Sequence, residues 1–92
     1  MIRSFAHKGL KRLYEAGDRS KLPADMAARI AVLLAALDEA ESVDDLNRPS
    51  FRLHPLKGDL KGFWSITVRA NWRIVFRFVD GEALDVDFTD YH

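Results

Sequence analysis

The stretch FWSITVRANWRIVFRFVDGEALDVDF, residues 63–88, decides the fold. Its apolar residues recur at every second position in three runs, which are Trp64, Ile66 and Val68, then Trp72, Ile74, Phe76 and Phe78, then Leu84, Val86 and Phe88. A period of two is typical of strands that bury one face. The runs are separated by Arg69-Ala70-Asn71 and by Asp80-Gly81, and Asp-Gly is a favoured two-residue hairpin turn of the primed type. The sequence therefore predicts an antiparallel meander of three strands whose apolar face must be covered.

The residues before this stretch predict the elements that cover the sheet. Ile2–Phe5 alternate as in a short first strand, and His7–Ala16 has the pattern of a helix that stops at Gly17. A second helix is predicted to have Pro23 in its first turn. Its apolar stripe is the strongest periodic signal in the chain: Met26, Ala27, Ile30, Ala31, Leu33, Leu34 and Leu37. We therefore expect the α+β class, with two N-terminal helices packed on one face of a small, mainly antiparallel twisted sheet.

Length and composition set the broad class of the protein. The 92 residues suffice for a single domain, 1–92, and the composition, 48% hydrophobic and 30% charged, is that of a globular protein. There is no cysteine, which excludes disulfides, thiolate zinc sites and a cysteine nucleophile. The N-terminus lacks the apolar segment of a signal peptide, and no apolar run approaches the ~20 residues that span a membrane. We expect a soluble cytoplasmic protein.

The 14 basic and 14 acidic residues balance, but they lie in separate blocks. Residues 1–12 carry cations and no acid, and residues 52–77 carry Arg52, Lys57, Lys61, Arg69, Arg73 and Arg77 against the single acid Asp59. The acids collect at 38–45 and at 80–90. Two interpretations stay open: such short blocks arise by chance, or they form a basic face that holds phosphates, with the acids placed elsewhere.

The polar residues of the three runs share the second face of the predicted sheet, and they are Ser65, Thr67, Arg73, Arg77, Asp85 and Asp87. Cross-strand Arg–Asp pairs, each worth ~0.2–1 kcal/mol, account for Arg77 without any function. They leave open why the cationic segment 52–62 and the terminal Asp90-Tyr91-His92 lie at the ends of the same strands.

The three histidines differ in their surroundings. His7 follows a strand and opens a helix, which is the place of a helix-end residue, whereas His54 lies in an irregular segment and His92 ends the chain. With Asp90, the last two could supply metal ligands, but no pair has the spacing of a metal site and there is no cysteine. A serine nucleophile and a phosphate-binding glycine loop both lack their motifs.

What remains is a metal-free proton-transfer site of two imidazoles, a carboxylate and a phenol beside several cations. RNA cleavage suits these groups because the 2′-hydroxyl is an internal nucleophile. The protein must remove one proton, donate another to the 5′ leaving oxygen and stabilise the charge on the phosphate oxygens. Imidazole, with an ordinary pKa of ~6.5, suits the first two tasks, and Lys or Arg suits the third. The residues permit this chemistry without requiring it.

Three motifs carry a resemblance to a known family: His54-Pro55-Leu56-Lys57-Gly58 before the sheet, Trp72-Arg73-Ile74 in the middle strand, and the terminal Asp90-Tyr91-His92. With the opening MIRSF and HKGL, they make essentially the whole chain resemble the HigB toxins of the RelE/ParE superfamily. The resemblance implies a RelE-like microbial ribonuclease-type fold with a concave active site on the sheet face opposite the helices.

The activity implied by the resemblance is that of a type II toxin, a ribosome-dependent endoribonuclease that cuts mRNA in the ribosomal A site without a metal or other cofactor. The implied partners are a HigA-like helix-turn-helix antitoxin, which also represses the operon, together with the 70S ribosome and mRNA. No membrane is implied.

The family's site residues carry over onto the catalytic set His54, Asp90, Tyr91 and His92 and onto the phosphate- and RNA-binding set Lys57, Arg73 and Asn71. His54 and His92 would share the acid and base roles in an order left open, Asp90 would orient an imidazole, and Tyr91 would donate a hydrogen bond or stack on a base. The alternative is a ParE-like binding module that inhibits without cutting and is neutralised by an antitoxin. Such a module has no need of these titratable groups. A structural adaptor would need a large exposed apolar patch, which the predicted core does not leave.

Overall fold

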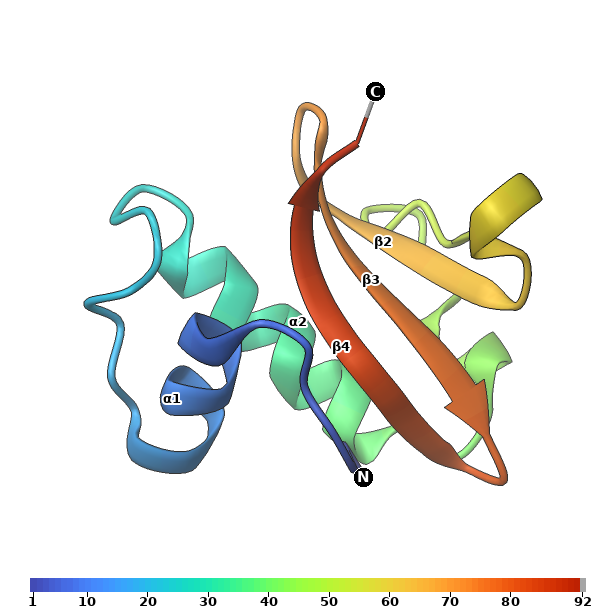
Figure 1. Cartoon of the computed structure of the whole chain (residues 1–92), viewed down its shortest axis with the longest axis horizontal. Helices are drawn as coiled ribbons and strands as arrows, with labels where there is room; N and C mark the ends of the chain where they lie inside the picture. Colours follow the sequence, from blue (N-terminus) through green and yellow to red (C-terminus); the bar gives the residue numbers. More distant parts are fainter. Residues whose placement is uncertain (92) are drawn as a thin grey trace.

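The computed structural model describes residues 1–91, in which two helices pack on one face of a four-stranded sheet (Figure 1). The helices are α1 (Lys8–Ala16) and α2 (Ala27–Glu39), and two short 3-10 helices lie later in the chain, η1 (Val43–Leu46) and η2 (Gly58–Leu60). The strands are β1 (His54–Pro55), β2 (Phe63–Arg69), β3 (Trp72–Val79) and β4 (Glu82–Asp90). Each strand pairs antiparallel with the next. The predicted α+β class is confirmed.

The core lies between the helices and the sheet. Its completely buried side chains come from both layers: Leu10, Ile30, Leu33, Leu37, Leu46, Ile66, Ile74, Phe76 and Val86. The members on α2 have the helical spacing read from the sequence, and those on β3 have a spacing of two. Neither described helix has the length and apolar character needed to cross a membrane.

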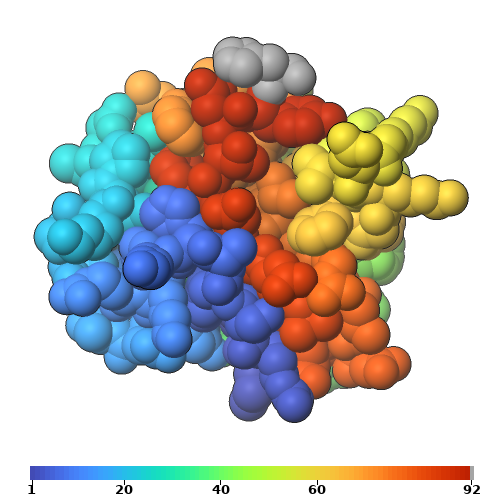
Figure 2. Space-filling model, viewed as in Figure 1, coloured from blue at the N-terminus to red at the C-terminus, as the bar shows by residue number. Residues whose placement is uncertain are grey.

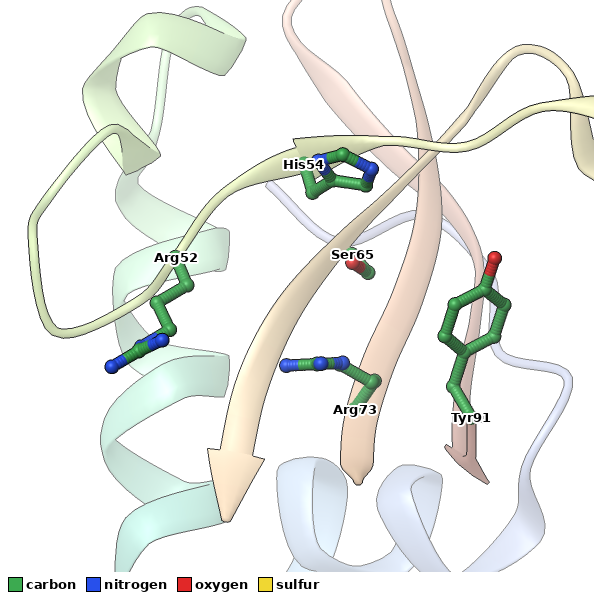
Figure 3. Close-up of a pocket in the computed structure, with 5 residues that line it drawn as sticks. All are labelled: Arg52, His54, Ser65, Arg73 and Tyr91. Atoms are coloured by element: carbon green, nitrogen blue, oxygen red, sulfur yellow. The ribbon is translucent and has the colours of Figure 1, made fainter. Parts of the chain in front are cut away.

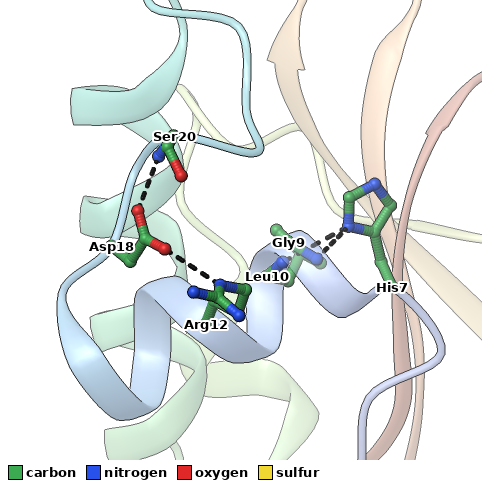
Figure 4. Close-up of polar contacts among 6 residues, drawn as sticks. All are labelled: His7, Gly9, Leu10, Arg12, Asp18 and Ser20. Atoms are coloured by element: carbon green, nitrogen blue, oxygen red, sulfur yellow. Dashed lines mark hydrogen bonds and ion pairs between the residues drawn. The ribbon is translucent and has the colours of Figure 1, made fainter.

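The two ends of α1 follow the sequence closely (Figure 4). His7 is the N-cap, and its Nδ1 accepts hydrogen bonds from the amides of Gly9 at 3.0 Å and Leu10 at 3.2 Å. The imidazole thereby satisfies two of the amides that a helix N-terminus leaves without partners. Gly17 ends the helix with a φ of 67°, a left-handed conformation that glycine adopts without strain. His7 is therefore the helix-end residue that the sequence predicts.

Asp18 closes the loop after α1 (Figure 4). Its carboxylate accepts hydrogen bonds from the Ser20 amide and the Arg12 guanidinium, both at 2.9 Å. The hydrogen bonds from Ser20, joined by that from Arg12, hold the pKa of Asp18 well below its usual range. The carboxylate consequently stays ionised throughout the neutral range.

The start of α2 differs from the prediction. The helix begins at Ala27, not with Pro23 in its first turn, because residues 23–26 form a separate turn. The Met26 amide donates to the Pro23 carbonyl at 3.0 Å, and the side chains of Leu22 and Met26 are both buried. Packing of this connection against the core thus holds Pro23 outside the helix.

The segment that contains His54 is not the irregular loop that the sequence predicts. His54 and Pro55 form β1 and pair with Ser65 and Trp64 of β2. Backbone bonds on both sides extend the attachment: Thr67 N donates to Phe51 O at 2.7 Å, and Leu56 N donates to Phe63 O at 2.9 Å. Phe51 and Leu56 are buried, so the core anchors the segment at both ends. The sheet therefore has a fourth strand, which was missed because two residues show no periodicity.

The turn between β3 and β4 has the predicted geometry. Asp80 and Gly81 have φ values of 51° and 79°, and positive φ at both central residues is what a primed turn of type I′ requires. The hairpin twist therefore follows from two residues that the sequence identifies.

The pairing of β3 with β4 contains one extra residue on β4. Val75 pairs with Asp87, but Arg77 pairs with Leu84, so the register shifts by one position. Asp85 lies in this bulge with a φ of 53°. Since a bulge reverses the alternation of faces, Ala83 is buried while Leu84 is only partly buried. The prediction that Leu84 belongs to the buried face is wrong for this reason.

The N-terminal segment runs beside β4 but does not form the predicted strand (Figure 2). Ile2 and Phe5 make isolated parallel bridges, to Ala83 and Val86 respectively. Between them, Ser4 contacts the bulge: its Oγ accepts from the Asp85 amide at 2.9 Å. Because the bulge interrupts β4 at this point, continuous pairing over residues 2–5 is prevented.

Asp38 on α2 fastens the start of the chain to the helix layer. Its Oδ1 accepts hydrogen bonds from the Ile2 amide at 2.9 Å and from the Tyr14 hydroxyl at 2.7 Å. Burial by itself raises the pKa of Asp38, but these hydrogen bonds and the nearby amino terminus outweigh it and lower the pKa. The same hydrogen bond to Asp38 raises the pKa of Tyr14.

Replacing Asp38 with Asn should remove a pH-dependent part of the stability. Because the folded pKa is the lower one, the ionised carboxylate stabilises the fold above its unfolded pKa of ~3.9, and this contribution is lost as the pH falls through the folded value. We expect Asp38→Asn to lower the free energy of unfolding by ~1 kcal/mol at neutral pH, since bonds to a charged acceptor are the stronger ones. Urea unfolding in neutral and acidic solution measures the difference, which should narrow in acid. Glu39→Gln is the control, and an Asp38→Asn deficit that is unchanged in acid would contradict the prediction.

Candidate active site

The sheet register arranges the side chains opposite the helices in rows. One row crosses all four strands through paired positions: His54, Ser65, Val75 and Asp87. The next row crosses three strands: Thr67, Arg73 and Thr89. Directly paired residues of an antiparallel sheet project to the same face, so both rows lie on the side away from the helices. The rows bring residues that are far apart in the sequence to one surface.

A hollow of about 290 Å³ lies on this face, lined by Arg52, His54, Ser65, Arg73 and Tyr91 (Figure 3). Figure 3 shows the His54 imidazole on β1 above Ser65, with Arg73 below on β3 and the Tyr91 ring at the side, beyond the end of β4. The Arg52 side chain turns away from the other four, toward a neighbouring hollow of about 330 Å³ that Arg73 also lines. An imidazole, a phenol and the Arg73 guanidinium therefore surround one concave surface, with Arg52 at its edge.

Four arginines elsewhere in the described chain form ion pairs, whereas the two at this surface do not. The ion pairs of residues 1–91 join Arg3 to Glu82, Arg12 to Asp18, Arg69 to Asp25 and Arg77 to Asp85. None of them neutralises Arg52 or Arg73 within the described part of the chain. Arg73 is instead held by a hydrogen bond that its Nη1 donates to Thr67 Oγ1. The Thr67 hydroxyl therefore holds the Arg73 guanidinium beside the hollow without neutralising its charge.

Arg77, by contrast, has the structural role that cross-strand pairing predicts. Its Nε and Nη2 both lie 2.9 Å from Oδ2 of Asp85, so the guanidinium spans the bulge. Its charge is therefore compensated on the sheet itself.

Backbone pairing holds the end of the chain in place as far as the structure describes it. Asp90 pairs with Trp72, and the Tyr91 amide donates to the Asn71 carbonyl at 2.8 Å. Behind them, Phe88 stacks on Trp72 with ring centroids 4.8 Å apart. Tyr91 is therefore placed by β4 and the core, although 37% of its surface is exposed.

The structure unites only part of the predicted site. It brings His54, Arg73 and Tyr91 to one hollow, but Lys57, Asn71 and Asp90 do not line it. Lys57 is exposed at the N-cap of η2, Asn71 is exposed in the β2–β3 turn, and strand alternation places Asp90 on the opposite face from Thr89 and Tyr91. His92 lies outside the described residues.

Two lining residues, Arg52 and Ser65, were not among the predicted site residues. Arg52 was counted only in the basic block, and Ser65 only among the polar residues of the sheet. The signal for Ser65 is its pairing with His54, which appears only once β1 is recognised. Among residues 1–91, no group of three or more His, Cys, Asp or Glu side chains is arranged to hold a metal ion.

Comparison with known sequences gives the family. Residues 3–92 match the family of HigB-like toxins, described as the RelE-like toxin of the type II toxin–antitoxin system HigB. The chain is 54% identical over 92 residues to Endoribonuclease HigB of Proteus vulgaris, with both chains covered completely. It is 36% identical over 94 residues to Toxin HigB-1 of Vibrio cholerae, which covers 100% of this chain and 98% of that one.

Solved structures share the fold at lower sequence identity. A YafQ variant from E. coli matches with a TM-score of 0.62 at 20% identity, over 98% of this chain and 93% of that one. The toxin–antitoxin complex YoeB–YefM from Staphylococcus aureus gives a TM-score of 0.62 at 18% identity, over 100% and 98%. At such identities the likeness shows the fold alone. The match in sequence over nearly the whole length shows more: the chain belongs to the HigB-like family, the RelE-like toxins of type II toxin–antitoxin systems.

Proposed function

We propose that this toxin is a metal-free endoribonuclease that cleaves mRNA in the ribosomal A site through attack of the 2′-hydroxyl on the adjacent phosphate. The observation that carries the proposal is the hollow in which the His54 imidazole, the Tyr91 phenol and the Arg73 guanidinium meet. The name of the relative from Proteus vulgaris, an endoribonuclease, supports the same reaction class.

The reaction needs proton transfer and charge stabilisation, and the substrate supplies the nucleophile. One group takes the proton of the 2′-hydroxyl and another donates a proton to the 5′ oxygen as its bond to phosphorus breaks. In the proposal, His54 and His92 share these two tasks, and Asp90 orients an imidazole. Tyr91 donates a hydrogen bond or stacks on a base.

Cations stabilise the phosphate oxygens as negative charge builds on them. Arg73 suits this task because Thr67 orients its guanidinium and no carboxylate within residues 1–91 forms an ion pair with it. Arg52 supplies a second cation at the edge of the hollow. Lys57 and Asn71, which lie outside the hollow, contact RNA farther from the scissile bond.

The charge of the protein supports the proposed dependence on the ribosome. Formal net charge is zero, and most arginine side chains with a close partner are paired with acids. A protein without net positive charge, with only a small cluster of cations at the hollow, has weak affinity for free RNA at physiological salt. The ribosome would supply the positioning that the protein lacks.

The proposal extends to the setting of the toxin. Chain 1–92 acts as one toxin domain in the cytoplasm, where mRNA is translated. Its antitoxin is a HigA-like helix-turn-helix protein that also represses the operon. A ParE-like module that inhibits without cutting would leave the group of His54, Tyr91 and Arg73 without a purpose.

Replacing His54 with Ala should lower the cleavage rate on programmed ribosomes by at least ~10²-fold, because general acid–base assistance is lost. Primer extension on translating ribosomes measures the rate, and a parallel reaction with free mRNA at physiological salt should show no cutting. His54 is exposed and outside the core, so its replacement leaves the melting temperature unchanged. Wild-type cleavage by the variant would show that His54 transfers no proton.

Two arginine substitutions on neighbouring strands should show whether the cleavage rate depends on a cation at the hollow or on positive charge in general. Arg73→Ala should lower the rate ~10²–10³-fold, the usual effect of removing one group that stabilises developing charge. Arg69→Ala removes the same charge, but that guanidinium is exposed and paired with Asp25 at 2.7 Å, so the rate should stay close to wild type. Equal losses in the two variants would indicate a general loss of RNA affinity instead.

Deleting Tyr91 and His92 should give a folded protein that does not cut RNA. Among the described contacts, the backbone loses only the Tyr91–Asn71 hydrogen bond, while Phe88 remains stacked on Trp72. Circular dichroism on heating should therefore show a cooperative transition close to that of the full chain. An unfolded truncation product would mean that the two residues serve the fold and not the chemistry.

A further inference from the structure

Arg29 on α2 contacts the backbone of two segments that are distant from it and from each other in the sequence. Its Nη2 donates to the Ser50 carbonyl at 2.7 Å and to the Thr67 carbonyl at 3.2 Å. Its guanidinium carbon also lies 5.4 Å from the centroid of the Phe51 ring, within the range of a cation–π contact. One partly exposed side chain therefore joins the helix layer, the segment before β1 and strand β2.

The segment that Arg29 holds, residues 50–54, depends on a small number of contacts. β1 has only two residues, and the second is a proline, which has no amide hydrogen to donate to β2. Before β1, the Thr67 amide donates to the Phe51 carbonyl at 2.7 Å. β2, by contrast, pairs with β3 over most of its length. Loss of the Arg29 hydrogen bonds would consequently loosen segment 50–54 and leave β2 in place.

Segment 50–54 contains a strained residue at the edge of the hollow of about 290 Å³, which we call the first hollow. Arg52 has a φ of 50°, a left-handed conformation that residues with a side chain rarely adopt. Such a conformation persists where the surrounding contacts enforce it. The buried Phe51 ring and the contacts of Arg29 lie immediately before Arg52, and the pairing of β1 lies after it. The strained residue is therefore held from both sides.

His54 follows Arg52 by two residues, so the path of segment 50–54 determines where its imidazole stands above the first hollow (Figure 3). We propose that Arg29 is a positioning residue of the candidate active site, which sets the place of the His54 imidazole by holding segment 50–54 against β2. Arg29 does not line the first hollow, so it acts through the backbone. The inference rests on the proposed nuclease function, because it assigns Arg29 to the proton transfer of His54. A reacting group that is displaced by ~1 Å can slow a reaction ~10²-fold.

Arg48 offers a matched comparison for Arg29. Its guanidinium carbon lies 5.0 Å from the centroid of the same Phe51 ring, and the residue is exposed. Among the described contacts, only Arg29 adds hydrogen bonds from its side chain to backbone carbonyls. Replacement by lysine keeps the positive charge at either position, but the lysine side chain is one bond shorter and lacks the planar guanidinium. Only at position 29 does this substitution withdraw a hydrogen-bond donor from segment 50–54.

Single-turnover cleavage on programmed ribosomes, with toxin in excess, tests the proposal. Arg29→Lys should lower the saturated rate about tenfold, because the imidazole is misplaced, and should leave the half-saturating toxin concentration unchanged. A fold that is merely less stable would raise that concentration instead, since excess toxin compensates for an unfolded fraction. Arg48→Lys should match the wild-type protein in both quantities. A wild-type saturated rate in Arg29→Lys, or equal losses in the two variants, would overturn the inference.

Double variants identify the group through which Arg29 acts. In His54→Ala protein, the further change Arg29→Lys should cause no additional loss, because the imidazole that it positions is absent. In Arg73→Ala protein, Arg29→Lys should still lower the rate about tenfold, since the two residues serve different steps. An additional loss without His54 would overturn the inference. So would the absence of any effect in Arg73→Ala protein, which would assign Arg29 to the cation.

Amide hydrogen exchange measured by NMR tests the same contact without any cleavage. In Arg29→Lys, the Thr67 amide, which is bonded to Phe51, should exchange about tenfold faster because segment 50–54 opens more often. The Leu56 amide, which is bonded to β2 beyond His54, should keep its wild-type rate. Unchanged exchange at Thr67 would overturn the inference. If exchange there is faster but the wild-type protein cuts no message, the nuclease proposal fails and the role of Arg29 in holding His54 stands.

Discussion

The backbone pairing of β3 with its two neighbours holds the side chains of the candidate site in place. One face of β3 buries Ile74 and Phe76 in the core, while Arg73 and Arg77 project to the other face. A slip of one residue in either register would exchange these faces, and burial of the aromatic and aliphatic side chains makes that exchange costly. The hydrophobic contact with the helices therefore determines on which face of the sheet the guanidinium groups lie.

The bulge at Asp85 connects this sheet to the start of the chain. The extra residue opens β4 to Ser4, and the Arg77–Asp85 pair closes the same irregularity from the other side. Ala6, a few residues farther along, lines a hollow of about 430 Å³ on the same face of the sheet, to which Asp85 also contributes. The bulge is thus the point at which the N-terminal segment, the sheet and this hollow meet.

The meander and the helices could be predicted because each has a local signal: a period of two, a helical stripe, or an Asp-Gly turn. The strand β1, the bulge and the late start of α2 have no such signal, since they depend on partners distant in the chain. For the site, residue chemistry and family resemblance together named His54, Arg73 and Tyr91. Convergence of Arg52 and Ser65 on the same hollow follows only from the long-range register. Asp90 was predicted for the site together with its neighbour Tyr91, but it does not line the hollow. Adjacent residues of a strand face opposite sides of the sheet, so closeness in sequence was misleading here.

Because β4 follows the other strands in the sequence, it also determines when the first hollow is completed during synthesis. Ser4 and Asp85 are 81 residues apart in the sequence yet form one contact, and Tyr91 enters the first hollow from beyond β4. A chain still under synthesis emerges N-terminus first, so its helices, β2 and β3 can collapse before β4 is available. Until the last strand is released, the N-terminal segment has no partner on the sheet and the hollow lacks one wall. The first hollow is therefore completed only after β4 has left the ribosome.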